Sequence, residues 1–499
     1  MIEGILIGLN TALSIKNIIM VMIGCFAGTI IGMLPGLGPM TAIALMIPIT
    51  YGFEPSTGLI LMAGVYYGAV FGGSTSSILI NAPGIPGTVA TSFDGYPMAQ
   101  QGKAGKALAI AAYSSFAGGT ISAIFLLIAA PSLSLVSLSF RSPDYFGLMI
   151  LGLTAVAAFS SKGNFLKAMM MVVLGLMLAS VGQDTLSDIP RFTFDNMNLS
   201  DGISFVLVVM ATFAMSEALT IIFKANDPTK AAKQISLSQL GSIKLDKDET
   251  KKMVTTIPRS SVLGFIIGVL PGAGATIASF LAYGMERNFV NDEEKQKFGK
   301  GSVNGIAAPE TANNAACSGS FVPLLTLGIP GSGTTAVMLG ALLGFGIQPG
   351  PRLYQTNPEI FWSVIMSMYI GMVVLLILNL PLIPYIARVL ATPRTFLIPL
   401  ILFFSLTGVY LMSFNNFDIY MMIGIAVVAT VLRLYDFPMP PLILAFVLGG
   451  LMEENLRRSL LISDGSWSFM WDRPLTIAVS YTHLRAHETR EDRGWRRVR

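Results

Sequence analysis

The chain has 499 residues, of which 53% are hydrophobic and 12% are charged. A soluble domain carries about 25% charged residues, so this chain has too little polar surface to coat a soluble globule and is predicted to lie in a membrane. Six Arg and three acidic residues in 481–499 supply +3 of the formal net charge of +4, so the remainder is nearly neutral and predicts no nucleic-acid-binding surface.

Long apolar segments recur along the chain, and a membrane-spanning helix needs about 20 mainly apolar residues. The first half has them at 18–34, 57–80, 104–130, 145–161, 165–181 and 203–223. The second half has them at 262–283, 324–345, 360–390, 396–411, 419–434 and 441–451. Because Gly and Pro interrupt several segments, the sequence predicts an all-α polytopic membrane protein with about ten to twelve spans.

Charged residues divide the loops into two kinds. The segment 224–259 contains eight Lys or Arg residues, and the positive-inside rule predicts that it is cytoplasmic. Residues 182–201 carry four Asp against one Arg and are expected to face outward. We therefore predict a first membrane repeat over 1–223, a cytoplasmic linker over 224–259 and a second repeat over 260–480.

The two predicted halves share short sequences in the same order. Residues 28–38, GTIIGMLPGLG, match residues 264–274, GFIIGVLPGAG, at eight of eleven positions. Farther along, Gly-Ile-Pro-Gly occurs at 84–87 and again at 328–331. Chance similarity between apolar segments explains this shared order of Gly and Pro poorly. Internal duplication with helices broken at matching positions is typical of secondary transporters and points to their binding sites.

Each eleven-residue motif contains a Pro-Gly pair between two apolar segments. Pro removes a backbone donor and Gly permits unusual backbone conformations, so the helix is expected to unwind there. The next helix would direct its free N–H groups and positive dipole end at a cavity, which suits an anion. We predict substrate contacts from Gly36, Gly38, Gly272 and Gly274; a plain helix kink is the alternative.

Four consecutive hydroxyl residues lie in the otherwise apolar segment 57–80, and a Pro- and Gly-rich break follows at 81–88. Hydroxyl and carbonyl oxygens are the ligands that a hard cation prefers, and hydroxyls can also donate to a carboxylate. Close helix packing through small residues is the alternative. The sequence predicts that Ser77 helps to bind a cation, and that substrate contacts come from Ser74, Thr75, Ser76, Asn81, Gly84 and Gly87.

Glu310 borders an apolar segment and is the acid of greatest interest in the chain. Buried acids in membranes are costly and usually functional. The nearby Asn313 and Asn314 add amide oxygens and N–H donors. We predict that these three residues form a coupling site for a sodium ion or a proton, with further substrate contacts from Gly331 and Ser332. An acid at the membrane interface is the alternative for Glu310.

The sequence contains no pattern typical of an enzyme site. Its two His residues, His483 and His487, lie in the last segment, which excludes a Ser–His site in the membrane. The phosphate-binding pattern Gly-x-x-x-x-Gly-Lys-Ser/Thr is absent, so ATP hydrolysis is not expected. Cys25 and Cys317 are isolated in apolar surroundings and are predicted to pack as small hydrophobic residues. We predict no catalytic residue, and no cofactor or metal beyond a coupling ion.

The order of these motifs resembles the tripartite tricarboxylate transporter family, and the chain resembles its large membrane subunit. The resemblance covers residues 1–479 and rests on Leu-Pro-Gly-x-Gly at 34–38, Gly-Gly-Ser-Thr-Ser-Ser-Ile at 72–78, Asn-Ala-Pro-Gly at 81–84, Ala-Pro-Glu-x-Ala-Asn-Asn-Ala at 308–315 and Gly-Ile-Pro-Gly-Ser at 328–332.

The resemblance implies a subunit of the bacterial inner membrane that works with a small four-helix membrane subunit and a periplasmic substrate-binding protein. It implies import of di- and tricarboxylates or related organic acids, driven by a cation gradient. It also implies two repeats of opposite membrane orientation. The residues themselves leave two alternatives open, a channel or passive membrane scaffold and a transporter of a neutral solute.

Residues 481–499 depart from the family's pattern. They are rich in Arg, contain no Lys and hold both His residues, and they follow an apolar segment that begins at Pro474 and soon stops. We interpret them as a non-native tail that truncates the last helix. A cytoplasmic tail that binds anionic lipid is the alternative.

Overall fold

The computed structural model describes residues 2–34, 37–160, 165–184, 187–224, 241–272, 274–386 and 394–472. Gly36, residues 225–240 of the predicted linker and the predicted non-native tail lie outside these ranges. Within them the chain is almost wholly helical, and the one sheet is a short antiparallel hairpin that pairs Gly182 with Arg191. The predicted all-α class is confirmed.

The elements of the first half precede the basic segment. They are α1 (Ile2–Ala12), α2 (Ile15–Met33), α3 (Gly38–Thr50), α4 (Pro55–Ile80), η1 (Pro86–Thr88), α5 (Val89–Met98), η2 (Ala99–Lys103), α6 (Ala104–Ser137), α7 (Ser142–Ser160), α8 (Phe165–Ala179), β1 (Gly182–Gln183), β2 (Pro190–Arg191), η3 (Met197–Leu199), α9 (Phe205–Val209), η4 (Met210–Met215) and α10 (Ser216–Lys224).

The elements of the second half begin inside the predicted linker. They are α11 (Lys247–Val269), α12 (Gly274–Phe289), α13 (Asp292–Lys295), α14 (Val303–Gly319), α15 (Phe321–Leu327), α16 (Gly333–Gly344), α17 (Leu353–Thr356), α18 (Pro358–Asn379), α19 (Ile383–Ile386), α20 (Arg394–Ser413), α21 (Asn416–Leu434), α22 (Pro440–Ile462) and η8 (Trp467–Met470).

Six helical segments among the described residues are long and apolar enough to cross a membrane. They are Ile15–Met33, Pro55–Ile80, Pro86–Val136, Phe205–Phe223, Pro358–Asn379 and Asn416–Leu434. Shorter apolar helices also occur, such as α3, α8 and α16. The segment 324–345, predicted as one span, is instead α15 and α16, because the chain leaves the helix at Gly328, which has a φ of 68°. The total of ten to twelve spans stays a prediction.

Glycines bring α2 and α4 into backbone contact in the first half. A Cβ at Gly28 would lie 2.3 Å from the Val65 carbonyl oxygen, and one at Gly32 would lie 2.2 Å from the Ala69 oxygen. Side chains larger than hydrogen therefore do not fit at these two positions. Such close approach through small residues is how membrane helices gain packing energy without a hydrophobic effect between them.

The second half repeats this contact with α11 and α14. A Cβ at Gly264 would lie 2.4 Å from the Ala312 oxygen, and one at Gly268 would lie 2.3 Å from the Ala316 oxygen. Gly264 and Gly268 are the counterparts of Gly28 and Gly32 in the matched motifs. The shared sequence therefore encodes one helix-packing arrangement used twice, with α14 in the place of α4.

The equivalent helices α4 and α14 run antiparallel to each other. Tyr67 of α4 bonds through its hydroxyl to that of Ser318 at 2.8 Å, whereas Ser74, farther along α4, reaches back to Glu310. Contacts that advance along one helix while receding along the other define opposite directions. Repeats of opposite orientation are typical of secondary transporters.

The structure aligns the second pair of shared motifs differently from their identical Gly-Ile-Pro-Gly sequences. Asn81 and Gly328 are the residues with positive φ that end α4 and α15. A Cβ at Gly84 would meet the Gly32 oxygen, and one at Gly331 would meet the Gly268 oxygen. Residues 81–84 therefore correspond to 328–331, and the identical Gly-Ile-Pro-Gly letters at 84–87 lie three residues too far along.

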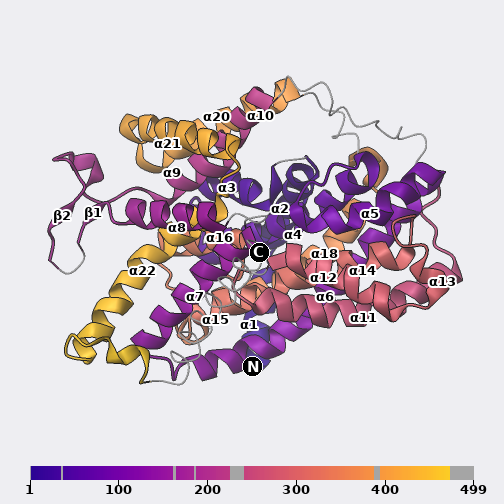
Figure 1. Ribbon diagram of the computed structural model, residues 1–499, viewed down its shortest axis with the longest axis horizontal. Coiled ribbons are helices and arrows are strands. Elements are labelled where there is room, and N and C mark those ends of the chain that lie inside the picture. Colours follow the sequence, from indigo (N-terminus) through magenta and orange to yellow (C-terminus); the bar gives the residue numbers. More distant parts are fainter. Residues whose placement is uncertain are drawn as a thin grey trace, which may run out of the picture.

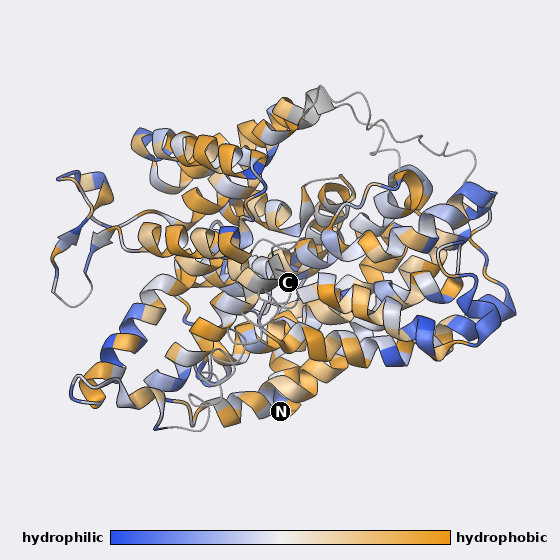
Figure 2. Cartoon of the chain, in the orientation of Figure 1, coloured by the Kyte–Doolittle hydropathy of each residue, from blue (hydrophilic) through white to orange (hydrophobic). Residues whose placement is uncertain are grey.

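Polar structure gathers at opposite ends of the molecule. Figure 1 shows the β1–β2 hairpin at one end of the long axis, and α13 with the start of α11 at the other. Figure 2 shows hydrophilic residues at both ends and apolar helices between them. Ion pairs hold the hairpin to α22, with Arg457 2.5 Å from Asp184 and Arg191 2.8 Å from Glu453. The predicted outward and cytoplasmic loops thus lie on opposite sides of the apolar body.

Candidate functional site

The carboxylate of Glu310 lies at the centre of the candidate site. Its side chain has no exposed surface. Three hydroxyls donate to it from three different helices: Ser74 of α4 at 2.7 Å, Thr91 of α5 at 2.5 Å and Ser115 of α6 at 2.9 Å. Elements far apart in the sequence therefore close around one acid, which does not fit an acid at the membrane interface.

The sequence of α14 explains how four helices approach so closely. This helix is rich in Ala, and all of its residues are buried. On the facing side of α6, a Cβ at Gly118 would lie 2.4 Å from the Thr311 carbonyl oxygen. Small residues on both surfaces bring the backbones together, so that even short hydroxyl side chains reach Glu310.

Glu310 lacks a basic partner among the described residues, because its recorded partners are the three hydroxyls. A buried carboxylate without a counter-charge is expensive, and hydrogen bonds offset only part of that cost. A buried acid in a membrane protein is usually functional, which makes Glu310 a candidate site for a proton or another cation.

The two amides that follow Glu310 differ in their contacts. Asn314 donates to the Glu310 backbone oxygen at 3.0 Å, and its own side-chain oxygen has no partner among the described residues. Asn313 is fully buried, and neither its amide nitrogen nor its amide oxygen has a partner there. Buried polar groups are nearly always hydrogen-bonded, so the two unpartnered atoms of this amide make Asn313 a candidate ligand-binding residue.

Gly87 lies directly against the Asn313 side chain. A Cβ at Gly87 would come within 2.6 Å of the Asn313 amide oxygen, so any residue larger than glycine at position 87 would collide with this amide. Phe93 of α5 contacts Phe280 and Tyr283 of α12, and α12 also packs against η1. The Asn313 amide therefore lies beside η1, in the region where α5, α12 and α14 pack together.

The glycines after the Pro-Gly breaks behave as predicted for unwound backbone. Gly38 and Gly274 begin α3 and α12 with φ of 63° and 61°, and Gly272 has φ of 83°. The Gly272 N–H donates to the Gly331 oxygen at 3.0 Å, which ties the break after α11 to the break before α16. Gly36, the counterpart of Gly272, lies outside the described residues.

The starts of three short helices converge near these breaks. A Cβ at Gly274 would lie 3.8 Å from the Ser332 Cβ, and one at Gly333 would lie 3.0 Å from the Met40 sulfur. The helices α3, α12 and α16 thus begin close together. The Ser332 hydroxyl caps α16 by accepting from the Thr335 N–H at 3.2 Å, so it is occupied within its own helix turn.

The remaining predicted hydroxyls do not reach Glu310. Ser76 and Ser77 donate to the Gly73 carbonyl oxygen at 3.1 and 2.9 Å, and Ser77 also donates to Thr88 at 2.8 Å. The structure therefore separates Ser77 from the coupling group in which it was predicted. Thr75 instead lines a small cavity between α4 and α6.

Three residues of this site escaped the sequence analysis: Thr91, Ser115 and Asn379. Ser114 and Ser115 form a polar pair within the apolar segment 104–130, which was a usable signal. Thr91 follows the predicted break closely, but only the tertiary structure shows that its helix turns back to α14.

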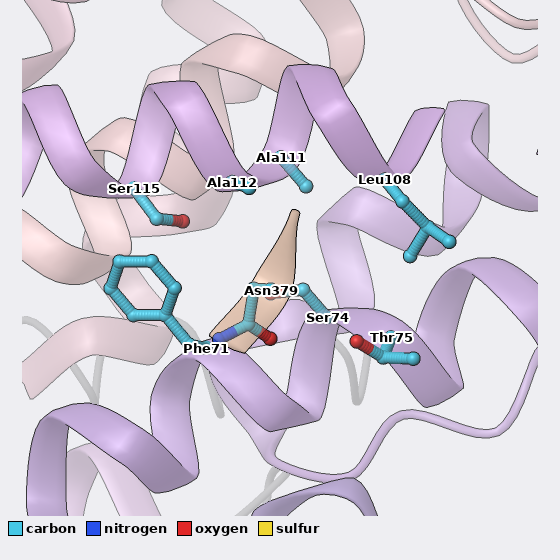
Figure 3. A pocket seen from close by; sticks show the side chains of 8 residues that line it. All are labelled: Phe71, Ser74, Thr75, Leu108, Ala111, Ala112, Ser115 and Asn379. Carbon is cyan, nitrogen blue, oxygen red and sulfur yellow. The ribbon is translucent and has the colours of Figure 1, made fainter. Parts of the chain in front are cut away.

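A small cavity adjoins the Glu310 hydroxyls (Figure 3). Its polar lining comes from Ser74, Thr75, Ser115 and Asn379, and the Asn379 amide oxygen has no partner among the described residues. The remaining lining is apolar and comes from Phe71, Leu108, Ala111 and Ala112. The cavity has room for about one water molecule.

Antiparallel repeats with broken helices, closing on a buried acid among hydroxyls and amides, are the architecture of a secondary membrane transporter. The model of the tripartite tricarboxylate transporter TctA family matches residues 18–444 of the chain. The chain therefore belongs to the tripartite tricarboxylate transporter TctA family, and the predicted resemblance is confirmed.

Two proteins of Agrobacterium vitis, both described as uncharacterized, are similar to the chain. A 52.8 kDa protein in the TAR-I ttuC' 3' region is 41% identical over 479 residues, which cover 96% of this chain and 94% of that protein. A protein in the TAR-II ttuC' 3' region is 42% identical over 216 residues, which cover 43% of this chain and 88% of that protein. No solved structure matches the chain at a significant level.

Proposed function

We propose that this chain forms the path by which a di- or tricarboxylate, or a related organic acid, enters the cell across the bacterial inner membrane. A cation gradient drives this import. The observation that carries the proposal is the juxtaposition on α14 of a buried, hydroxyl-bound Glu310 and an Asn313 amide without a partner among the described residues.

The substrate carboxylate is proposed to bind at the Asn313 amide, beside Gly87 of η1. The amide N–H group, which has no partner among the described residues, is a donor suited to an anion. Gly87 leaves the space that this requires. The basic side chains of Arg259 and Lys106 are engaged with Glu286 and Glu249, so we assign the anion to backbone and amide donors.

The coupling cation is proposed to bind at Glu310. An inside-negative membrane potential opposes the entry of an anion by roughly 2.3 kcal/mol per charge per 100 mV. A cation that enters with the substrate offsets this barrier. Because Glu310 and Asn313 are one helical turn apart, the two ligands would bind near each other and could depend on each other.

The partners proposed for the chain are a small four-helix membrane subunit and a periplasmic substrate-binding protein. The word tripartite in the family's description supports two further subunits. In this arrangement the soluble protein selects the carboxylate and delivers it to the outward face, where the β1–β2 hairpin projects. The membrane subunit then needs only a general carboxylate site built from amide and backbone donors.

Transport by the reconstituted complex tests this proposal. Proteoliposomes loaded with unlabelled citrate or another di- or tricarboxylate are expected to accumulate labelled substrate by counterflow, and to take it up against its gradient when a cation gradient is imposed. A channel would show no exchange accelerated by internal substrate. A neutral solute carrier would ignore every carboxylate in the panel. Either result would overturn the proposed function.

A further inference from the structure

The Glu310 hydroxyl shell and the adjoining cavity lie on the side of α6 that faces the end of α18. The residue after Asn379, Leu380, is buried with Ala109 and Ala112, and Leu245 packs against them. We call Leu380, Ala109, Ala112 and Leu245 the Leu380 cluster. Ala112 belongs both to this cluster and to the cavity wall. Leu245 lies in the basic segment predicted to be cytoplasmic, so a thin apolar layer separates the cavity from that side.

We propose that Glu310 binds a proton, rather than a sodium ion, and exchanges it with the cytoplasm through this cavity when the Leu380 cluster opens. This inference rests on the proposed function and specifies its coupling ion and the route of that ion. It concerns Glu310, the hydroxyls of Ser74 and Ser115, and the Asn379 amide.

The geometry of the hydroxyl shell favours a proton. A hard metal cation takes about six oxygen ligands around a common centre. Here the three hydroxyls lie directly on the carboxylate at hydrogen-bond distances of 2.5 to 2.9 Å, which leaves no centre between them. Each hydroxyl can donate to a carboxylate or accept from a carboxylic acid by rotating its O–H bond. The same shell therefore satisfies both protonation states of Glu310 without moving.

On the helices around α14, other charged side chains form ion pairs or hydrogen bonds with groups other than Glu310. Asp94 of α5 accepts from the Ser302 and Gly301 N–H groups and from the Tyr283 hydroxyl. Lys106 of α6 pairs with Glu249, and Arg259 and Lys252 of α11 pair with Glu286 and Glu294. Tyr66 and Tyr67 of α4 bond to Ser332 and Ser318, and Cys317 lies on α14 itself. The other titratable groups on these helices are Tyr96, Tyr113, Lys247, Asp248, Lys251 and Arg287, and none of them is a hydrogen-bond partner of Glu310 among the described residues. Charge at the site thus changes through Glu310.

Proton release follows from the contacts in order. Protonated Glu310 gives its proton to the Ser115 or Ser74 hydroxyl, which passes its own proton to a water in the cavity. The hydroxyl then donates to the carboxylate that remains, so no other bond changes. A water in this cavity has hydroxyl partners on one side and the unpartnered Asn379 oxygen on the other, which meets the needs of a buried water. The hydronium leaves past the Leu380 cluster.

The variant Glu310→Gln separates a proton site from a sodium site. Gln resembles the protonated acid but cannot release a proton, so any counterflow of labelled carboxylate that this variant retains should no longer respond to pH. Net uptake driven by a pH gradient should fall by about a hundredfold, which is the scale of losing a proton-transferring group. A pH dye inside wild-type vesicles should report one or more protons per substrate in sodium-free buffer.

Two results would overturn the proton assignment while leaving the proposed function intact. One is wild-type uptake that requires a sodium gradient and carries no proton. The other is a Glu310→Gln protein that inserts normally and still takes up carboxylate in response to a pH gradient. Failure of the wild-type complex to move any carboxylate would instead count against the proposed function.

Asn379 provides the test of the route. Asn379→Leu should slow pH-driven uptake by about tenfold, and more than it slows counterflow, whereas the small polar variant Asn379→Ser should retain pH-driven uptake. The matched control is Asn455→Leu, since Asn455 makes the same bond to the carbonyl four residues earlier (2.8 Å, against 2.9 Å for Asn379) without lining the cavity. Equal uptake by Asn379→Leu and the control would exclude this route.

Discussion

Glu310 and Asn313 are neighbours on α14, but their surroundings prepare them for different ligands. The Glu310 oxygens are saturated by hydroxyl donors, while both polar atoms of Asn313 lack a partner among the described residues. A saturated acid can change its protonation state in place, whereas the unpartnered amide N–H group of Asn313 gains a hydrogen bond from a ligand that accepts one. At the scale of single residues, this difference supports the proposed division of the site into a cation part and an anion part.

Gly87→Ala should abolish carboxylate uptake by filling the place of the Asn313 amide. The added Cβ would come within 2.6 Å of the amide oxygen, and the Asn313 side chain would have to move. Uptake in vesicles should fall by at least about tenfold, with normal amounts of protein in the membrane. The control Gly284→Ala places its Cβ in open space on α12. Wild-type uptake by Gly87→Ala would contradict the assignment of Asn313 to the substrate.

Gly272→Val should also abolish transport, because it disturbs the backbone conformation of the break rather than a side chain of the site. The residue has φ of 83°, which a β-branched residue rarely adopts, and its N–H holds the Gly331 oxygen. Gly36→Val is expected to do the same, because Gly36 is its counterpart in the repeated motif. Vesicle uptake and membrane insertion are the two measurements. Normal transport by either variant would show that these breaks do not form part of the substrate site.

At the scale of elements, the carboxylate of Asp94 fixes the start of α14 in place. Asp94 lies on α5 and is fully buried, and it accepts hydrogen bonds from the N–H groups of Gly301 and Ser302 and from Tyr283. One side chain thus joins α5, α12 and α14, which together carry Thr91, the proposed anion site and Glu310. The relative position of these helices depends on a group outside the site itself.

Asp94→Ala should lower the free energy of unfolding by about 3 kcal/mol, because one buried and two partly buried donors lose a charged acceptor. Thermal unfolding in detergent, followed by fluorescence, measures this loss. Asp248→Ala on the exposed start of α11 is the control; its only recorded ion pair is a mostly exposed one with Lys252, and it should change stability little. Equal stability of the two variants would show that Asp94 does not organise these helices.

At the scale of the whole molecule, we predict the orientation of the chain in the membrane from its two polar ends. The acidic hairpin and the basic start of α11 lie at opposite ends of the apolar body (Figures 1 and 2). The antiparallel arrangement of α4 and α14 gives each half a similar framework facing opposite sides. A pair of repeats of this kind can present one site to either side by a change in the packing between them.

Labelling of single cysteines tests this orientation. A cysteine at Ser242 should react with an impermeant maleimide from the cytoplasmic side only, and one at Asn198 from the periplasmic side only. Both positions are exposed, whereas the native Cys25 and Cys317 are fully buried and should stay unlabelled. Labelling of Ser242→Cys from the periplasm would reverse the assignment of sides.

The sequence by itself determined the class of protein and the places where its helices break. A chain with 12% charged residues must be solvated by lipid, and Pro-Gly pairs cannot continue a helix. Both are local properties, so Glu310, Gly38 and Gly274 were identified without knowledge of their partners. The repeated motif also indicated an internal duplication, and the structure shows that the contact of α2 with α4 recurs between α11 and α14.

Only the tertiary structure decided which polar groups meet. Four consecutive hydroxyls, Ser74 to Ser77, look alike in the sequence, yet Ser74 reaches Glu310 while Ser76 and Ser77 turn to the Gly73 oxygen. On a helix, neighbouring residues point about 100° apart, so the helix that approaches from each direction selects their roles. That approach is set by close contacts between helices far apart in the sequence, such as that of Gly118 on α6 with Thr311 on α14, and no local pattern in the sequence records it.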